Sequence, residues 1–490
     1  MDKDNILKKT LSGFAWEGST KILIQSLTWV TTVLVARILS PEDYGVVAIS
    51  GVFTGALVLI TNLGLMSSLI NMKEVDQEDY DSVFWLNIIF SIFLYTFIYA
   101  MAPIIASFYE SEQLVDVIRL SGVILPLHGL MIVPVATAMR NMDYKYRAIV
   151  DSLGQFVTAI SALVLAYSGY GVWTLVVSVL IGQSVVVCAY FPLMNGIPRF
   201  SIKIDRIMKI APFGLYVTGS DVLAFFTRSA GVMIIGLFLS ERIVGLYSMA
   251  WHLSTMPMDK VGSIFNRIAF PAISRSRDNA SFAGKLFINM HKYLLVVTYP
   301  VFIGFALLAE DIVVLLLTDK WIQIAPIIQA LCVLNMLRIS GMVMPPVLTG
   351  LGLARWMFKY NVISSFVMPI VFLVGVQFGL EGILAAWFIA FPVLYIYMLT
   401  ILLPKLELSP LGFLDTFRTP MICSGIMALL LLFIAPYFDM ENRIIELVIT
   451  VALGMFIYVL SYCLLFKKDL TALLARVKLI RNSGIAEADK

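Results

Sequence analysis

Long apolar stretches recur along the entire chain, and this pattern constrains the fold more than any other feature. Of 490 residues, 60% are hydrophobic and 14% are charged, whereas about a quarter are charged in soluble domains. A helix needs about 20 consecutive apolar residues to cross the hydrocarbon core of a bilayer. The sequence therefore predicts an all-α integral membrane protein with fourteen transmembrane helices. We expect these near residues 12–38, 46–70, 83–107, 116–138, 148–168, 171–193, 208–239, 244–270, 290–317, 322–349, 357–378, 381–403, 418–437 and 443–466.

Lysine and arginine are concentrated in alternate connections between these helices. The basic segments carry Lys3, Lys8 and Lys9, then Arg140, Lys145 and Arg147, Arg199, Lys203, Arg206 and Lys209, Arg275, Arg277, Lys285 and Lys292, Arg355 and Lys359, Lys405 and Arg418, and Lys467, Lys468, Arg476, Lys478 and Arg481. Because cytoplasmic loops carry an excess of Lys and Arg, we expect both termini in the cytoplasm. The connections are short, the longest being about twenty residues near 271–289. The formal charge of +3 does not indicate a nucleic-acid partner.

Short sequence motifs in the first half of the chain recur in the second half, at matching helix junctions. The pairs are Leu39-Ser40-Pro41-Glu42-Asp43-Tyr44-Gly45 with Leu239-Ser240-Glu241-Arg242-Ile243-Val244-Gly245, Pro134-Val135-Ala136-Thr137 with Pro346-Val347-Leu348-Thr349, and Gly169-Tyr170-Gly171 with Gly379-Leu380-Glu381-Gly382. Internal repeats of this kind are common in transporters. We expect a six-helix bundle at 1–200 and a second at 201–405, related by a pseudo-twofold axis along the membrane normal. Residues 406–490 would then add helices 13 and 14 and a cytoplasmic tail.

Polar residues follow helical spacing inside several of these apolar stretches, mainly the first two of each repeat. Charged side chains are costly in a membrane and therefore point to function. The candidates for a substrate-binding cleft between the bundles are Lys21, Gln25, Asn62, Asp221, Arg228, His252, Lys260 and Arg338. The candidates for ion coupling are Glu17, Asp221 and Asp259. Lys21 and Asp221 occupy equivalent positions of the repeat, so we expect them to approach each other across the cleft.

Two interpretations of these charges are open. They could be structural ion pairs, as Glu17 with Lys21 would be at i and i+4. They could instead form a cationic cleft, which favours an anionic cargo because the planar guanidinium of arginine donates hydrogen bonds in pairs. The four cysteines, Cys188, Cys332, Cys423 and Cys463, show no metal-ligand spacing. We therefore expect no metal and no cofactor, while coupling to a proton or sodium gradient stays open.

Several motifs resemble those of a known family. They are the 39–45 word above, Arg140-Asn141-Met142-Asp143-Tyr144-Lys145-Tyr146-Arg147, Gly171-Val172-Trp173-Thr174-Leu175, Gly245-Leu246-Tyr247-Ser248-Met249-Ala250 and Phe270-Pro271-Ala272-Ile273-Ser274-Arg275. As an ordered set they are similar to the Wzx-type polysaccharide-repeat flippases of the multidrug/oligosaccharidyl-lipid/polysaccharide exporter superfamily. The resemblance is to the branch for colanic-acid-like and teichuronic-acid-like repeats. That family typically has an Asp shortly after the arginine of helix 7, where this chain has Gly231, which argues against ion coupling there.

The resemblance implies a function and a location. The cargo would be an oligosaccharide repeat on undecaprenyl pyrophosphate, moved from the inner to the outer leaflet of the bacterial cytoplasmic membrane. The protein would move this cargo by alternating access, and the cargo would serve surface polysaccharide biosynthesis (capsule, exopolysaccharide or O-antigen). Membrane lipids and a polysaccharide polymerase or chain-length machinery would be the other partners. Arg228 and Lys21 would meet the pyrophosphate, whereas Asp221 and Asp259 would release or couple ions.

Two alternatives remain open at this point. A cation-coupled multidrug exporter would have the same fold, with anionic pockets in place of cationic ones. A membrane polysaccharide polymerase or glycosyltransferase would need a catalytic site at the membrane face. The sequence lacks an Asp-x-Asp, HExxH or P-loop motif in its expected context. We therefore expect a transporter and no enzyme.

Overall fold

The computed structural model describes residues 24–62, 64–72, 75–194, 198–276, 279–434 and 442–467. For residues 67, 68, 71, 204–217, 259, 260, 263–268, 270–272 and 354 it describes the backbone alone. Within these ranges every regular element is helical, and eleven segments are long and apolar enough to cross a membrane. The all-α membrane fold is thus confirmed, and the count of fourteen crossings stays a prediction.

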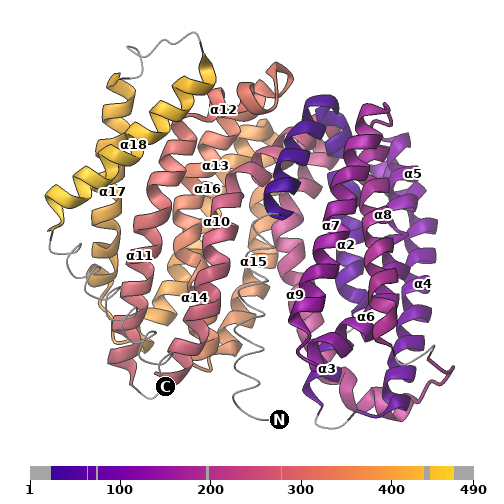
Figure 1. Ribbon diagram of the computed structural model, residues 1–490. Helices are drawn as coiled ribbons and strands as arrows, with labels where there is room; N and C mark the ends of the chain where they lie inside the picture. The colour runs from indigo at the N-terminus through magenta and orange to yellow at the C-terminus, as the bar shows by residue number, and fades with distance from the viewer. Residues whose placement is uncertain are drawn as a thin grey trace. The chain divides into compact units, whose positions relative to one another are not determined.

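The helices pack into two compact units (Figure 1). Unit 1 comprises Met1–Met249 and Asn361–Ala386, and unit 2 comprises Ala250–Tyr360 and Trp387–Lys490. Unit 1 holds the first helix (Ile24–Ile38), α2 (Pro41–Thr61), α3 (Leu65–Asn71), α4 (Gln77–Phe108), α5 (Glu112–Ser121), α6 (Ile124–Arg140), α7 (Tyr144–Tyr167), α8 (Trp173–Tyr190), η1 (Phe191–Leu193), α9 (Ile204–Phe238) and η3 (Val376–Phe378). Unit 2 holds α11 (Ala280–Leu307), α12 (Ala309–Leu316), η2 (Asp319–Ile324), α13 (Ala325–Met342), α14 (Met344–Gly350), α17 (Pro410–Ile434) and α18 (Arg443–Leu465).

Three long helices contribute to both units: α10 (Glu241–Arg275), α15 (Ala354–Gly375) and α16 (Gly379–Lys405). The boundaries near 200 and 405 that the repeat predicts stay a prediction. The long connection expected at 271–289 is wrong. Helix α10 continues to Arg275, and α11 begins at Ala280, because the Asn279 side chain accepts a hydrogen bond from the Phe282 N–H and caps the new helix.

Four of the expected spans are each formed by two helices. The pairs are α2 with α3, α5 with α6, α11 with α12, and α13 with α14. At the first break Gly64 has a φ of +63°, a conformation that side chains with a Cβ rarely adopt. The residues on both sides of each break are apolar, so hydropathy runs through it unchanged. Periodicity along the sequence therefore locates the crossing and misses the break.

Two turns that follow the second pair of repeated motifs have the same backbone structure. After α6 the N–H groups of Met142 and Asp143 donate to the carbonyls of Met139 and Ala138. After α14 the N–H groups of Gly352 and Leu353 donate to the carbonyls of Thr349 and Leu348. Met142 and Gly352 both have positive φ, at 58° and 78°. This is the bond pattern by which many helices satisfy their last carbonyls, and here it occurs just after the second pair of repeated words.

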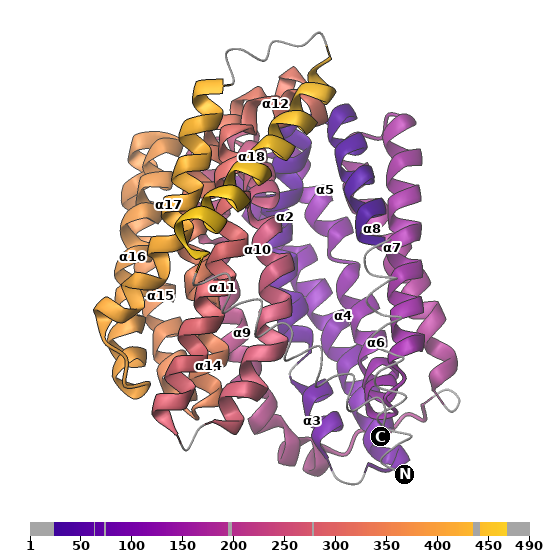
Figure 2. The same cartoon turned by 60° about the vertical axis from the view of Figure 1, so that its left-hand side comes forward.

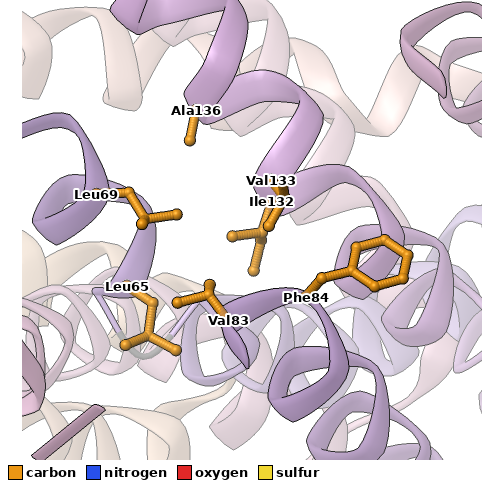
Figure 3. Close-up of a cluster of buried hydrophobic side chains, with 7 residues drawn as sticks. All are labelled: Leu65, Leu69, Val83, Phe84, Ile132, Val133 and Ala136. Atoms are coloured by element: carbon orange, nitrogen blue, oxygen red, sulfur yellow. The ribbon is translucent and has the colours of Figure 1, made fainter. Parts of the chain in front are cut away.

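A core of unit 1 lies where α3, α4 and α6 meet. Figure 3 shows its buried side chains, which are Leu65 and Leu69 from α3, Val83 and Phe84 from α4, and Ile132, Val133 and Ala136 from α6. Arg140, at the end of α6, donates to the carbonyls of Leu69 and Met72 at 2.9 and 2.6 Å. The arginine thereby satisfies carbonyls that the end of α3 leaves without helical partners. The core and this cap together fix α3 against α6.

The N-terminal ends of α2 and α10 cross at two glycines, within the part of α10 that belongs to unit 1. A Cβ built on Gly45 would lie 1.9 Å from the Glu241 carbonyl oxygen, and one on Gly245 would lie 1.7 Å from the Pro41 carbonyl oxygen. Beside them Arg242 Nη1 lies 2.8 Å from Glu42 Oε1. The two repeated motifs, 39–45 and 239–245, therefore contact each other at equivalent positions. Only glycine permits backbones to approach this closely.

A buried histidine connects four helices of unit 2. The Nδ1 of His291 (α11) lies 2.9 Å from the Thr416 hydroxyl of α17. Its Nε2 is hydrogen-bonded to the Ser340 hydroxyl of α13, which is bonded to the Tyr395 hydroxyl of α16. His291 and Ser340 are both 0% exposed. We call Thr416, His291, Ser340 and Tyr395 the His291 chain.

The donor and acceptor roles within the His291 chain follow from Thr416, at one end of the chain. The Thr416 hydroxyl donates its one hydrogen to the Phe413 carbonyl at 2.6 Å, so it accepts from His291, and Nδ1 carries the proton. In a neutral imidazole Nε2 then accepts from Ser340, which accepts from Tyr395. Every polar atom of the chain is satisfied with a neutral histidine. The chain thus joins α11, α13, α16 and α17 without burying a charge.

Replacing Gly45 by alanine tests the crossing of α2 and α10. The added Cβ must push the Glu241 backbone away, and overpacking of this kind costs about 1–3 kcal/mol. We expect Gly45→Ala to lower the thermal unfolding midpoint of the purified protein in detergent. Gly51→Ala is the matched control, since it is on the same helix with no atom within 4 Å of its Cβ, and it should leave the midpoint unchanged or slightly raised. Equal midpoints for both variants would contradict the close crossing.

Replacing Thr416 by valine tests the His291 chain at nearly constant volume. The variant leaves the Nδ1–H of His291 buried without an acceptor, which costs about 1–3 kcal/mol. We expect a lower unfolding midpoint for Thr416→Val in the same detergent assay. Thr96→Val is the control, because the Thr96 side chain is exposed and its hydroxyl bonds only to Ile92 in its own helix. A midpoint for Thr416→Val as high as that for Thr96→Val would show that the chain contributes nothing.

Candidate functional site

The first helix, Ile24–Ile38, borders a small cavity inside unit 1. This cavity has a volume of about 230 Å³. It is lined by Thr28, Thr31, Thr32, Val35, Tyr44, Gln155, Thr158, Ala159, Ala162, Leu175, Ser178 and Val179. The hydroxyls of Thr28 and Thr32 bond back to carbonyls one turn earlier, whereas the buried Thr31 hydroxyl makes no hydrogen bond with the described residues. Thr28 and Thr32 thus face the interior of unit 1.

Helix α9 carries a row of charged side chains beside a row of hydroxyls. Asp221 and Arg228 are both exposed, and their spacing of seven residues puts them on one face of the helix. Thr227 and Ser220 immediately precede Arg228 and Asp221 in the sequence. The Thr227 hydroxyl lies 3.0 Å from the Ser365 hydroxyl on α15, and the Ser220 hydroxyl lies 3.5 Å from Nδ2 of Asn361. The hydroxyl row fixes α9 to α15 within unit 1. The charged row is open to contact with a ligand.

Gly231 lies one turn beyond Arg228, where the resembling family has an Asp. A Cβ built on Gly231 would lie 3.0 Å from the Tyr247 hydroxyl. A carboxylate at this position would require Tyr247 to move. Gly231 therefore packs directly against the Tyr247 side chain.

Arg338 is held against aromatic rings in unit 2. Its guanidinium carbon lies 4.4 Å from the ring centroid of Trp251 on α10 and 5.3 Å from that of Trp387 on α16. Its Nη1 donates to Asn335 Oδ1 at 2.8 Å. Asn335 Nδ2 in turn donates to the Ser254 carbonyl at 2.9 Å. We call Trp251, Asn335, Arg338 and Trp387 the Arg338 site.

The other predicted residues fall into three groups. Glu17 and Lys21 lie outside the described residues, so the pairing of Lys21 with Asp221 stays a prediction. Asp259 and Lys260 are on α10, where the backbone alone is described. The last group has described side chains: Gln25 and Asn62 are half-buried in unit 1, and His252 is exposed in unit 2, next to Trp251 of the Arg338 site.

The sequence identified Arg338 and missed the residues that hold it. Asn335 could have been found, because it precedes Arg338 by three residues, a spacing at which helical side chains meet. Trp251 adjoins the predicted His252, but nothing in the sequence relates it to Arg338. Trp387 comes from a third helix. Contacts between distant segments of this kind leave no trace in local periodicity.

A larger cavity in unit 2 has a different character. Its volume is about 580 Å³. Its lining residues come mainly from α11, α12, α17 and α18, whose ribbons are labelled in Figure 2. Its lining is almost wholly apolar: Val296, Val297, Pro300, Val301, Gly304, Phe305, Leu308, Ile312, Met427, Leu431, Thr450, Val451, Gly454, Met455, Tyr458 and Val459. Such a surface suits hydrocarbon. Across the described residues, no group of His, Cys, Asp or Glu is arranged to hold a metal ion.

The chain matches one family model and several curated relatives. The family is described as "Polysaccharide biosynthesis protein", and its model matches residues 34–326. The succinoglycan biosynthesis transport protein ExoT of Rhizobium meliloti (strain 1021) is 23% identical, over 98% of this chain and 99% of the relative. The lipopolysaccharide biosynthesis protein WzxC of Escherichia coli (strain K12) is 22% identical, over 77% of this chain and 78% of the relative. The teichuronic acid biosynthesis protein TuaB of Bacillus subtilis (strain 168) is 22% identical, over 68% and 70%.

Solved structures of the same fold include two kinds of transporter. The lipid II flippase MurJ in an inward closed conformation has a TM-score of 0.76 and 15% identity, covering 93% of this chain and 99% of that one. An inward-facing MATE-family multidrug resistance transporter of the MOP superfamily has a TM-score of 0.62 and 17% identity, covering 81% and 99%. The resemblance inferred from the sequence motifs is confirmed. Since the family model matches more than half of this chain, the chain belongs to the polysaccharide biosynthesis protein family.

Proposed function

We propose that the protein is a flippase for undecaprenyl-pyrophosphate-linked oligosaccharide repeats in the bacterial cytoplasmic membrane. The observation that carries the proposal is a pair of arginines, Arg228 and Arg338, in membrane-spanning segments of a chain from a polysaccharide biosynthesis family. Arginine inside a membrane is costly and marks a path for substrate. The planar guanidinium is suited to phosphate and carboxylate groups. Relatives are named for succinoglycan transport and for lipopolysaccharide and teichuronic acid biosynthesis.

The cargo has three chemically different parts, and the protein offers a surface for each. Arg228 and Lys21 would contact the pyrophosphate. Gln25, Asn62 and His252 would donate and accept hydrogen bonds with the saccharide. The apolar cavity among α11, α17 and α18, at about 580 Å³, would hold part of the polyprenyl chain. Lys260 and Arg338 would add positive charge to the path.

The transport cycle is alternating access between two six-helix bundles, 1–200 and 201–405, related by a pseudo-twofold axis. The equivalent contacts of Gly45 and Gly245 and the matching turns at Met142 and Gly352 support this arrangement. Both termini lie in the cytoplasm, according to the distribution of Lys and Arg. Asp221, Asp259 and Glu17 are the candidates for coupling to a proton or sodium gradient. A polymerase or chain-length protein would receive the cargo at the outer leaflet.

A cation-coupled multidrug exporter is the second candidate function. The fold similarity to a MATE-family transporter, at a TM-score of 0.62, and the exposed carboxylate of Asp221 favour it. Such a protein would bind cationic drugs and would have little use for arginine along its path. Removing Arg228 should therefore impair a flippase and have little effect on a multidrug exporter.

Reconstitution in proteoliposomes separates the two functions. The purified protein should move a fluorescent undecaprenyl-pyrophosphate-linked oligosaccharide between leaflets and should not transport a cationic dye. Arg228→Gln should slow lipid-linked cargo about tenfold or more, because a charge-assisted hydrogen bond to phosphate is lost. Arg147→Gln, which removes a partly exposed arginine paired with Asp151, should flip cargo at the wild-type rate. Dye transport without flipping would contradict the proposed function. Full flipping by Arg228→Gln would contradict the role of Arg228 in binding the pyrophosphate.

A further inference from the structure

The small cavity in unit 1 is bordered by a hydroxyl that the protein itself leaves unused. We call this cavity, which is lined by the first helix, α2, α7 and α8, the unit 1 cavity. Thr31 is 6% exposed, and its hydroxyl has no hydrogen-bond partner among the described residues. Ser178 on α8 is 2% exposed and lines the same cavity. Since leaving a buried hydroxyl without a partner is unfavourable, Thr31 indicates an occupant that can form a hydrogen bond.

Three other hydroxyls of the unit 1 cavity give their hydrogens to their own helices. Thr28 and Thr32 donate to carbonyls one turn earlier, and Thr158 donates to the Gly154 carbonyl at 2.9 Å. A hydroxyl that has donated its one hydrogen keeps lone pairs that can accept another bond. At these three positions the cavity therefore presents acceptors, which suit a ligand that carries several O–H groups.

The wall that carries Thr158 is fixed before any ligand arrives. A Cβ built on Gly182 of α8 would lie 1.8 Å from the Thr158 Oγ1 and 2.7 Å from the Gly154 carbonyl oxygen of α7. The two helices are thus in close contact beside the cavity, and only glycine permits such an approach. Because the threonine is already held in place, little conformational entropy is lost there on binding.

The chemistry of the lining disfavours a charged ligand and a purely apolar one. Among the described residues that line the unit 1 cavity, none is Asp, Glu, Lys, Arg or His. A metal cation or a pyrophosphate would therefore be buried without an opposite charge, which is costly. An acyl chain would leave the Thr31 hydroxyl unsatisfied. The lining thus favours a neutral ligand with hydroxyl groups.

A single sugar ring has these properties and fits the available space. The volume of about 230 Å³ equals that of about seven waters at about 30 Å³ each, which is close to the size of one hexose. The hydroxyls of a sugar both donate and accept, while its C–H faces can pack on the apolar lining residues Val35, Ala162 and Leu175. Gln155, an exposed residue of the lining, adds an amide that donates and accepts. Apolar walls with a few polar groups characterise small-molecule sites.

We propose that the unit 1 cavity binds one uncharged sugar residue of the cargo through the hydroxyls of Thr31 and Ser178. The inference rests on the proposed flippase function and deepens it by adding a saccharide site inside unit 1. Thr31 and Ser178 are within two turns of the helix ends at Ile38 and Trp173, or about 8–10 Å at 1.5 Å per residue. On the proposed topology these ends face outward. The sugar therefore occupies the cavity in the outer half of the membrane.

Binding of a free oligosaccharide tests the site without relying on transport. The probe is the oligosaccharide released by mild acid from the lipid-linked repeat of the source bacterium, and calorimetric titration of the full chain in detergent gives its Kd. Thr31→Val removes the hydroxyl at nearly constant volume and should raise the Kd about three- to tenfold, since one hydrogen bond is lost. Thr31→Ser keeps the hydroxyl and should bind nearly as wild type does. Thr96→Val, which removes an exposed hydroxyl of α4, should leave the Kd unchanged.

The thermal unfolding midpoint of the ligand-free protein separates binding from a structural role. Thr31→Val removes a hydroxyl that has no partner, so the midpoint should stay the same or rise. Ala159→Leu fills the cavity from α7, where Ala159 is 3% exposed and part of the lining. Filling a cavity commonly stabilises a protein, so this variant should keep the midpoint. It should nevertheless raise the Kd tenfold or more and slow the flipping of lipid-linked oligosaccharide in proteoliposomes.

The outcomes distinguish this site from the proposed function. A wild-type Kd for both Thr31→Val and Ala159→Leu would overturn the inference, because the cavity would then hold only water or lipid. A lower midpoint for Thr31→Val with an unchanged Kd would also overturn it, since the hydroxyl would then be structural. Flipping of lipid-linked cargo by a wild-type protein that does not bind the free oligosaccharide would overturn the inference alone. Binding that depends on Thr31 in a protein that flips nothing would refute the flippase function and leave the sugar site standing.

Discussion

The bilayer offers no water to a polar group, and the rest of the structure follows from this constraint. Backbone groups are satisfied within helices, which is why every regular element in the described part of the chain is a helix. Hydroxyls inside the spans bond back to carbonyls of their own helix, as Thr54 and Thr298 do. A side chain that finds too few hydrogen-bond partners in its own helix bonds to side chains of other helices and so links them. The His291 chain satisfies four side chains from four helices in this way, with no net charge buried.

Charged residues show a different solution to the same constraint. Arg338 has its charge held by two indoles and an amide, all in unit 2. Arg228 and Asp221 remain exposed on one face of α9, while the hydroxyls next to them fasten the helix to α15. The structure thus separates residues that hold helices together from residues that are open to a ligand. For a transporter this separation is useful, because a path must be polar without weakening the packing around it.

The sequence predicted the all-α membrane fold and missed details inside it, for physical reasons. Hydropathy identifies the apolar lengths that become α4, α7 and α16, since length and composition decide a crossing. The breaks near Gly64 and Leu308 escape it, because hydropathy does not change there. Intramembrane charge identified Arg228 and Arg338. His291 was passed over since its partners, Thr416, Ser340 and Tyr395, come from other helices, and His252, which drew attention through its polar neighbours, proved to be exposed.

The central claim is that this chain moves lipid-linked saccharides from the inner to the outer leaflet. The most direct measurement is deletion of the gene, followed by leaflet-resolved analysis of undecaprenyl-linked oligosaccharides in the cytoplasmic membrane. The account predicts that complete repeat units accumulate in the inner leaflet and that re-expression of the chain returns them to the outer leaflet. Complete repeat units accumulating in the outer leaflet, as loss of a polymerase would cause, or an unchanged distribution would contradict it.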